Sequence, residues 1–494
     1  MAEGTENLKS KAVNGVAWSF VGSMANRVIQ FVVSMILARL LTPSDYGLIG
    51  MLGFFIGIAS SFIDSGFSSA LIQYQERQNK DYCTVFYVNF GMSLLMYGLL
   101  YLCAPLIADF YNQPALVSII RAYCLTLIIG AMTAINGVRL TIDLNYKLSN
   151  VIGSTAALLS GIVGVLCAYS GFGVWALVAQ QLSASLIRMV LMFYHVRWFP
   201  SWEFSVQSFK RFFAYGSKLL MSGLIHNVYA QMYPLVIGKQ FTAADLGYVA
   251  RAQGFNDMAA GTMNGILGSV AFPVLTKLQD DEEKLLHVYD KYIQLSAFAV
   301  FPIVLFLCGI AKPLILFLLT DKWAASILLL QILSINYLWD GIIKINLNLL
   351  YVKGRTDLVL RLEIIKKTIA FCILLTSVFI GNLVVFCIGM SVYGTIALYL
   401  NTIYTKRLLN FGFVKQMKQI WPYLFASLII MAVALFISWA VPYSLISLIL
   451  STTICVPLYF IICYYRRLYA LNQAVEILAP KMGKLGEWLI DKVQ

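Results

Sequence analysis

The chain has 494 residues, of which 60% are hydrophobic and only 12% are charged, and its mean hydropathy is +0.79. Soluble domains carry roughly 45–50% apolar and about 25% charged residues. A chain with half that charge cannot cover a water-facing surface. The composition therefore excludes a soluble enzyme, a nucleic-acid-binding domain and a disordered chain, and it indicates an all-α polytopic membrane protein.

Apolar runs of about 20 residues predict transmembrane helices along almost the whole chain. Fourteen spans are expected, at 13–40, 46–73, 82–109, 114–140, 148–169, 172–194, 212–238, 245–275, 286–318, 323–351, 357–380, 383–405, 420–440 and 443–465. The connections are short, and the longest, 195–211, is the best candidate for an internal boundary. Residues 466–494 have the pattern of an amphipathic surface helix on the cytoplasmic side.

Basic residues are distributed unevenly between the two sides of this topology. Of the 36 Lys and Arg, 23 fall in loops on the side of both termini, 4 fall on the opposite side and 9 lie within spans. Cytoplasmic loops are enriched in Lys and Arg, so both termini are expected in the cytoplasm. The opposite loops, such as 42–45 and 170–173, are too short to hold an external domain.

Local catalytic and metal-binding motifs are missing from the sequence. The nine cysteines show no CxxC spacing, the three histidines are dispersed, and there is no P-loop or HExxH. We therefore expect no disulfide framework, no bound metal, no ATP-driven step and no catalytic residues.

An internal repeat divides the chain. ARLLTPSDYGL (38–48) and GKQFTAADLGY (238–248) share Thr, Asp and Gly at an offset of 200. Six predicted helices separate the two segments, which indicates parallel repeats with a substrate path between the halves. The expected organisation is an N-terminal lobe (1–194), a cytoplasmic linker (195–211), a C-terminal lobe (212–410), two extra helices (411–465) and a cytoplasmic tail (466–494).

Ionisable side chains inside the spans are the candidate site residues. A charge in the bilayer core costs about 2.5–3.5 kcal/mol, so such residues usually face a cavity or a partner. The cationic candidates for substrate binding are Arg27, Arg251, Lys218, Arg188 and Lys344. The polar residues expected to line the same cavity are Ser23, Asn26, Gln30, His226 and Tyr229. The acids that are candidates for ion coupling are Asp64, Asp257 and Asp340.

Structural explanations remain open for most of these residues. Polar stripes can simply join helices by hydrogen bonds. Asp340 and Lys344 are four positions apart and can neutralise each other. Arg188, Lys218 and Arg251 lie near predicted membrane faces and can extend to water. Arg27 is harder to explain in this way, because it is near mid-membrane with no carboxylate within four positions.

Cations outnumber acids within the spans, and this predicts a positive cavity for an anionic group such as phosphate or carboxylate. The residues alone therefore indicate a two-lobed transporter driven by an ion gradient.

Several segments resemble Wzx-type polysaccharide flippases of the multidrug/oligosaccharidyl-lipid/polysaccharide exporter superfamily. They are LARLLTPSDYGLIGM (37–51), FIDSGFSSALIQ (62–73), GFGVWALVAQQL (171–182), LVIGKQFTAADLGYVARAQGF (235–255) and AFPVLTKLQDDEEKL (271–285). Their combination and order over most of the chain carry the resemblance.

The resemblance implies a MATE-like fold of two six-helix lobes plus two helices. It implies that a polyprenyl-pyrophosphate-linked oligosaccharide is flipped across a bacterial inner membrane by alternating access, without nucleic acid and without a cofactor beyond a coupling Na⁺ or H⁺. Membrane lipids and the polysaccharide polymerase and export machinery are the expected partners. Arg27 and Arg251 match cavity cations of such flippases, and Asp64 lies in the matching FIDSG stretch. Tyr233 and Pro234 replace an acid that relatives often carry on the seventh helix.

Three alternatives are left open. A cation-coupled drug or metabolite antiporter of the same fold predicts an acid-dominated cavity. A membrane-embedded sugar polymerase or transferase predicts a large external loop with paired acids. A lipid scaffold without transport is compatible with the sequence.

Overall fold

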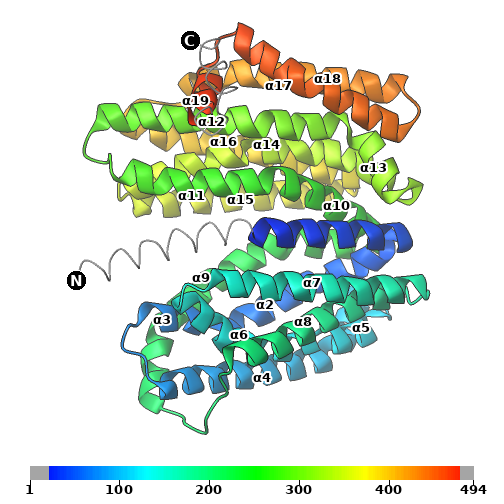
Figure 1. The fold of residues 1–494 in the computed structure, drawn as a ribbon, viewed down its shortest axis with the longest axis vertical. Coiled ribbons are helices and arrows are strands. Elements are labelled where there is room, and N and C mark those ends of the chain that lie inside the picture. The colour runs from blue at the N-terminus through cyan, green and yellow to red at the C-terminus, as the bar shows by residue number, and fades with distance from the viewer. Residues whose placement is uncertain (1–21, 479–494) are drawn as a thin grey trace. The chain divides into compact units, whose positions relative to one another are not determined.

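The computed structural model describes residues 22–478, and these form helices with no β-strand among them (Figure 1). The predicted all-α fold is confirmed. Backbone contacts divide the chain into two compact units, Met1–Gly247 and Tyr248–Gln494.

The first unit begins with a helix described over Gly22–Leu40. The helices that follow in it are α2 (Pro43–Asp64), α3 (Phe67–Gln73), α4 (Asn79–Tyr111), α5 (Leu116–Tyr123), α6 (Leu125–Ile142), α7 (Tyr146–Tyr169), α8 (Val174–Val196) and α9 (Val206–Gln240). The helix α10 (Ala243–Asn256) crosses from the first unit into the second.

The second unit continues with a π-helix, η1 (Asp257–Gly261), and contains one 3₁₀ turn, η2 (Asp321–Trp323). Its α-helices are α11 (Thr262–Thr276), α12 (Glu282–Gly309), α13 (Ala311–Leu319), α14 (Ala325–Val352), α15 (Thr356–Ile380), α16 (Leu383–Leu409), α17 (Phe413–Ala440), α18 (Ser444–Tyr465) and α19 (Tyr469–Leu478).

Each of the fourteen predicted spans is mostly helical where the structure describes it, and eleven helices of the described chain are long and apolar enough to cross a membrane. The other three spans correspond to α9, to α10 with α11, and to α15. Several charged residues lower the hydropathy of α9 and α15. The π-helix η1 divides the predicted span 245–275 into the two shorter helices α10 and α11. Within the predicted tail, α19 is helical, and residues 479–494 lie outside the described part.

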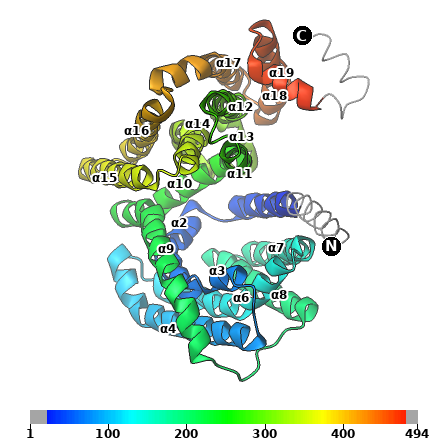
Figure 2. The same ribbon diagram turned by 90° about the vertical axis from the view of Figure 1, so that its left-hand side faces the viewer.

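The predicted linker 195–211 is held against the start of α4. Trp198 Nε1 donates to Asn79 Oδ1 at 3.0 Å, and Arg211 forms a 2.9 Å ion pair with the buried Asp81. The following helix, α9, packs on α2, α3 and α4 of the first unit (Figure 2). The boundary between the two units therefore falls after Gly247, one helix later than the predicted linker. The division into six-helix lobes stays a prediction.

The two repeat segments have the same local structure. The Thr42 backbone N–H and hydroxyl donate to Asp45 Oδ2 at 2.8 and 2.7 Å, which fixes the start of α2. The same two bonds join Thr242 to Asp245 at 3.1 and 2.8 Å at the start of α10. Each segment is a capping box, in which side chains satisfy the free N–H groups of the first helical turn.

The glycines of the repeat form a reciprocal contact. A Cβ atom on Gly47 would lie 1.6 Å from the carbonyl oxygen of Ala243, and one on Gly247 would lie 2.0 Å from that of Pro43. The two pairs are related by the same offset of 200 that relates the sequences. Only glycine permits this approach of two helix backbones, since any side chain occupies the space of the facing carbonyl group.

In the second unit, a buried polar network joins α12, α14 and α17. The Tyr289 hydroxyl donates to Asn346 Oδ1 at 2.7 Å, and Gln416 Nε2 donates to the same oxygen at 3.0 Å. Asn346 and Gln416 are fully buried. The network therefore fixes α17, the first helix after the predicted lobe, to the helices that precede it.

We predict that Gly47→Ala lowers the stability of the protein by about 1–3 kcal/mol, because the added methyl group overpacks the contact with Ala243. Thermal unfolding in detergent measures the effect. Gly98→Ala on α4 is the matched control, because a Cβ there meets nothing within 4 Å. Equal Tm values for the two variants would contradict the proposed backbone contact.

Candidate functional site

The predicted site residues divide between the two units, nine in the first and four in the second. The first unit holds Ser23, Asn26, Arg27, Gln30, Asp64, Arg188, Lys218, His226 and Tyr229. The second unit holds Arg251, Asp257, Asp340 and Lys344. Each group is described within its own unit.

The first described helix packs on α7 through small residues. A Cβ on Gly161 of α7 would lie 2.4 Å from Val33, and one on Gly153 would lie 3.4 Å from Asn26 Nδ2 and 3.6 Å from an Arg188 terminal nitrogen. The bare backbone at Gly153 thus makes room for polar groups from two other helices. Asn26 also accepts a hydrogen bond from Gln30 Nε2 at 3.3 Å.

Three predicted site residues from two helices are therefore close together in the first unit, namely Asn26, Gln30 and Arg188. Arg27, which follows Asn26 on the first described helix, is exposed. Ser23, one turn before Arg27, is exposed as well. The exposed guanidinium group of Arg188 on α8 therefore lies beside two of the predicted polar residues, Asn26 and Gln30. Their role in binding stays a prediction.

Asp64 lies at a break in the second span. Ser65 and Gly66 both adopt left-handed backbone angles, with φ of 45° and 72°, and end α2 before α3 begins. The exposed Asp64 carboxylate accepts a hydrogen bond from Ser68 Oγ at 2.5 Å. Its position just before α3 is favourable, because a helix N-terminus carries partial positive charge.

The backbone of α9 packs directly on this break. A Cβ on Gly66 would lie 2.8 Å from the carbonyl oxygen of Gly216, and one on Gly216 would lie 2.4 Å from that of Ser65. Lys218 follows two positions later and is exposed. The break was not predicted, although its Ser65–Gly66 dipeptide is typical of turns.

The polar residues of α9 that contact α2 are not the predicted ones. Asn227 Nδ2 donates to Ser61 Oγ at 2.6 Å, and Gln231 packs on Gly53 and Gly57 of α2. His226 is exposed and Tyr229 is half-buried. Asn227 and Gln231 were missed, although the small residues of α2 at spacings of three and four were a signal for close helix packing.

In the second unit, Arg251 is stacked on a tryptophan. Its guanidinium carbon lies 5.3 Å from the ring centre of the fully buried Trp323, and Tyr248 packs edge-on against the same ring at 6.1 Å. This cation–π contact gives half-buried Arg251 a structural partner within its own unit.

Asp257 and Asp340 lie near one tyrosine of α14. Asp257 is the first residue of the π-helix, and its carboxylate interacts electrostatically with the Tyr337 side chain, as does the carboxylate of Asp340. A π-helix often marks a functional position, because it shifts the register of side chains within a helix.

Asp340 and Lys344 form the predicted i,i+4 ion pair. Lys344 Nζ lies 2.8 Å from Asp340 Oδ2, and the two side chains are 46% and 39% exposed. Asn264 Nδ2 of α11 approaches the same carboxylate oxygen at 3.5 Å. The predicted ion pair is therefore present, and its functional role stays a prediction.

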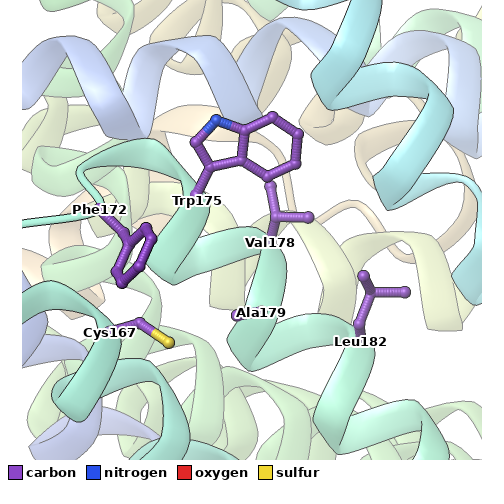
Figure 3. Close-up of a pocket in the computed structure, with 6 residues that line it drawn as sticks. All are labelled: Cys167, Phe172, Trp175, Val178, Ala179 and Leu182. Atoms are coloured by element: carbon purple, nitrogen blue, oxygen red, sulfur yellow. The ribbon is translucent and has the colours of Figure 1, made fainter. Parts of the chain in front are cut away.

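Two cavities of the described chain are lined by apolar side chains, and neither lining includes a predicted site residue. One cavity of about 450 Å³ is lined by apolar side chains of the α7–α8 hairpin, including Phe172, Trp175 and Leu182 (Figure 3). Another of about 250 Å³ lies between α12, α17 and α18. Their linings suit lipid chains rather than a sugar or a phosphate.

No group of three or more His, Cys, Asp or Glu residues could hold a metal ion within 22–478. The nine cysteines are unpaired thiols spread over both units.

Long apolar helices and short connections define a multi-pass membrane protein. The chain belongs to the family of polysaccharide biosynthesis proteins, whose sequence pattern matches residues 36–328.

Several curated proteins are similar over most of their length. The teichuronic acid biosynthesis protein TuaB of Bacillus subtilis is 23% identical over 71% of this chain and 73% of its own. The lipopolysaccharide biosynthesis protein WzxC of Escherichia coli is 24% identical over 80% of each chain. The succinoglycan biosynthesis transport protein ExoT of Rhizobium meliloti is 23% identical over 67% of each.

Solved structures share the fold. The lipid II flippase MurJ in an inward closed conformation aligns over 90% of this chain and 98% of its own, with a TM-score of 0.73 and 13% identity. An inward-facing MATE transporter aligns over 79% of this chain and 99% of its own, with a TM-score of 0.58 and 14% identity. The resemblance to Wzx-type flippases and the MATE-like fold are thereby confirmed, and the names agree with a transport protein rather than an enzyme.

We predict that Arg251 and Trp323 are energetically coupled. A double-mutant cycle of Arg251→Met and Trp323→Leu, read by thermal unfolding, should give a coupling energy of about 0.5–2 kcal/mol. Strictly additive effects would mean that the stacked geometry contributes nothing. Arg251→Lys should lose part of the contact, because Lys lacks the planar group that stacks on an aromatic face.

Proposed function

We propose that this protein moves a polyprenyl-pyrophosphate-linked oligosaccharide from the cytoplasmic to the outer leaflet of a bacterial inner membrane, for the assembly of a surface polysaccharide. The movement is by alternating access, both termini lie in the cytoplasm, and an ion gradient supplies the energy. The family, the names of its relatives and the flippase fold support the proposal.

The observation that carries the choice of an anionic substrate is the charge of the first unit. Arg27, Arg188 and Lys218 lie within predicted spans and are exposed, whereas Asp64 is the one exposed acid among the predicted residues of that unit. Guanidinium groups bind phosphate with two parallel hydrogen bonds. A pyrophosphate entering from the headgroup region requires such partners, because the hydrocarbon offers none.

The alternatives fit these observations less well. A transporter of cationic drugs requires an excess of acids, and the first unit has the opposite balance. A sugar polymerase requires a sizeable external domain, but the longest connection between helices in the described chain, 197–205, follows a helix that is predicted to end in the cytoplasm. Coupling through Asp64, Asp257 or Asp340 is part of the proposal, with Na⁺ or H⁺ as the ion.

The proposal predicts that a gene deletion removes the surface polysaccharide and that a lipid-linked oligosaccharide accumulates in the cytoplasmic leaflet. Mass spectrometry of extracted lipids identifies the glycan. If the polysaccharide persists and no lipid-linked intermediate accumulates, the chain is not its flippase.

We also predict that Arg27→Ala and Arg188→Ala each reduce surface polysaccharide about tenfold or more. A charge-assisted hydrogen bond contributes roughly 1.5–3 kcal/mol, and about 1.4 kcal/mol corresponds to a factor of ten. Complementation of the deletion strain measures the effect, with protein levels in the membrane checked by immunoblot. The exposed Lys415, in the first turn of α17, provides the control variant Lys415→Ala. A normal polysaccharide level in both arginine variants would remove these cations from substrate binding.

A further inference from the structure

One arginine of the first unit lies within a predicted span and has no acid beside it. Arg121 belongs to α5, which packs on α4 (Figure 1). Its guanidinium carbon lies 4.3 Å from the ring centre of Tyr101 on α4. Its Nε atom is buried, and neither an ion pair nor a hydrogen bond joins its side chain to another residue that the structure describes. Lys344 of the second unit, in contrast, is paired with Asp340.

The contact with Tyr101 satisfies only part of what this guanidinium group requires. The group carries a permanent charge and five N–H donors. The face of an aromatic ring attracts the charge, but it does not accept strong hydrogen bonds as an oxygen does. A cation within a span usually faces a partner or a water-filled cavity. The described residues supply no acceptor for Arg121, which indicates that the acceptor comes from outside the chain.

Two tyrosines of α4 hold Arg121 in place. The Tyr97 hydroxyl donates to the carbonyl oxygen of Arg121 at 3.3 Å, and the ring centres of Tyr97 and Tyr101 lie 6.0 Å apart. One tyrosine thus fixes the backbone and the other contacts the charge. The guanidinium group is therefore presented at a defined position, and a ligand that binds it does not have to order a freely moving side chain.

The depth of Arg121 in the span matches that of a lipid phosphate. Arg121 follows the first residue of α5 by five positions, or about 8 Å along a helix. This is close to the thickness of one headgroup layer. Further into the membrane, the exposed side chains of both helices are apolar, with Leu125 one turn beyond Arg121 and Leu95 and Leu99 on α4. A cation at headgroup depth above an apolar surface suits a phosphate that carries acyl chains.

We propose that Arg121 binds the phosphate group of an anionic phospholipid in the leaflet opposite to both termini. The guanidinium group donates two parallel hydrogen bonds to the phosphate oxygens, and Tyr101 supports it from one side. The acyl chains lie along Leu95, Leu99 and Leu125. The choice of leaflet rests on the topology within the proposed function, whereas the binding itself does not.

The charge of the site favours an anionic headgroup over a zwitterionic one. Phosphatidylcholine and phosphatidylethanolamine carry an ammonium group next to the phosphate, and that group would bring a second positive charge close to Arg121. No acid is paired with Arg121 among the described residues to offset it. Phosphatidylglycerol has no ammonium group, so it is the lipid that the site should select.

The first test measures lipid binding to the purified full chain by native mass spectrometry. Phosphatidylglycerol and phosphatidylcholine with the same acyl chains are added in turn. The tightest bound phosphatidylglycerol should bind Arg121→Gln with about tenfold lower affinity than the wild type, because the charge-assisted hydrogen bonds are lost. Binding of phosphatidylcholine should be equal in the two proteins. Equal affinity of both proteins for phosphatidylglycerol would overturn the proposal.

The matched control is Lys239→Gln, near the end of α9. Lys239 is a cation of the same unit whose Nζ donates to the carbonyl oxygen of Phe110 at 2.5 Å and lies 4.8 Å from the Phe110 ring centre. Because it already has a partner within the chain, its loss should leave the affinity for phosphatidylglycerol unchanged. If both variants lose affinity equally, the lipid responds to net charge and the site is wrong.

Arg121→Lys tests the geometry and provides a second variant if Arg121→Gln does not fold. Lys keeps the charge but lacks the planar group that binds phosphate through two bonds and stacks on a ring. Its affinity for phosphatidylglycerol should lie between those of Arg121→Gln and the wild type. An affinity equal to that of the wild type would overturn the proposed bidentate contact.

Competition identifies the source of the phosphate. Inorganic phosphate at millimolar concentration should not displace phosphatidylglycerol, because it lacks the acyl chains, and displacement would make Arg121 a site for a free anion instead. Displacement by a polyprenyl phosphate, but not by a second phospholipid, would assign Arg121 to the substrate path and overturn the proposal. Selective binding of phosphatidylglycerol by a protein whose deletion leaves the polysaccharide intact would refute the proposed function alone.

Discussion

In a hydrocarbon solvent, apolar side chains gain little by leaving lipid for protein. Helices are therefore held together by close van der Waals contact and by hydrogen bonds. Both units of this protein depend on glycines for that contact. In the first unit the backbones of Gly66 and Gly216 touch, and in the second a Cβ on Gly309 would lie 2.7 Å from Ala434 Cβ. The small residues that weaken a soluble helix are here what holds the helices at short distance.

The same glycines make space for polar groups. At Gly153 the bare backbone of α7 is approached by Asn26 and Arg188, and at Gly341 the backbone of α14 is approached by Asn264 and Ser296. In each unit a position without a side chain thus gathers polar atoms from two other helices. Close packing and the candidate binding chemistry are consequences of one feature, and changing such a glycine alters both.

Local relations were predictable from the sequence. The ion pair of Asp340 and Lys344 follows from their spacing of four on a helix. The repeated capping boxes at Thr42 and Thr242 follow from motifs that need only one turn of chain. The cation–π partner of Arg251 did not follow, because Trp323 is distant in sequence. The bonds of Asn227 with α2 were missed for the same reason.

By itself, the sequence determined the membrane class, the positions of the helices and the excess of cations within the spans. Hydropathy and helical period are properties of short segments, and in lipid a backbone segment must satisfy its own hydrogen bonds. The tertiary structure decided which face of each helix is covered and where the second span breaks. It also decided which buried oxygens, such as Ser296 Oγ, have no hydrogen-bond partner among the described residues. Those outcomes depend on which helices pack together, and the hydropathy of a segment does not determine its packing partners.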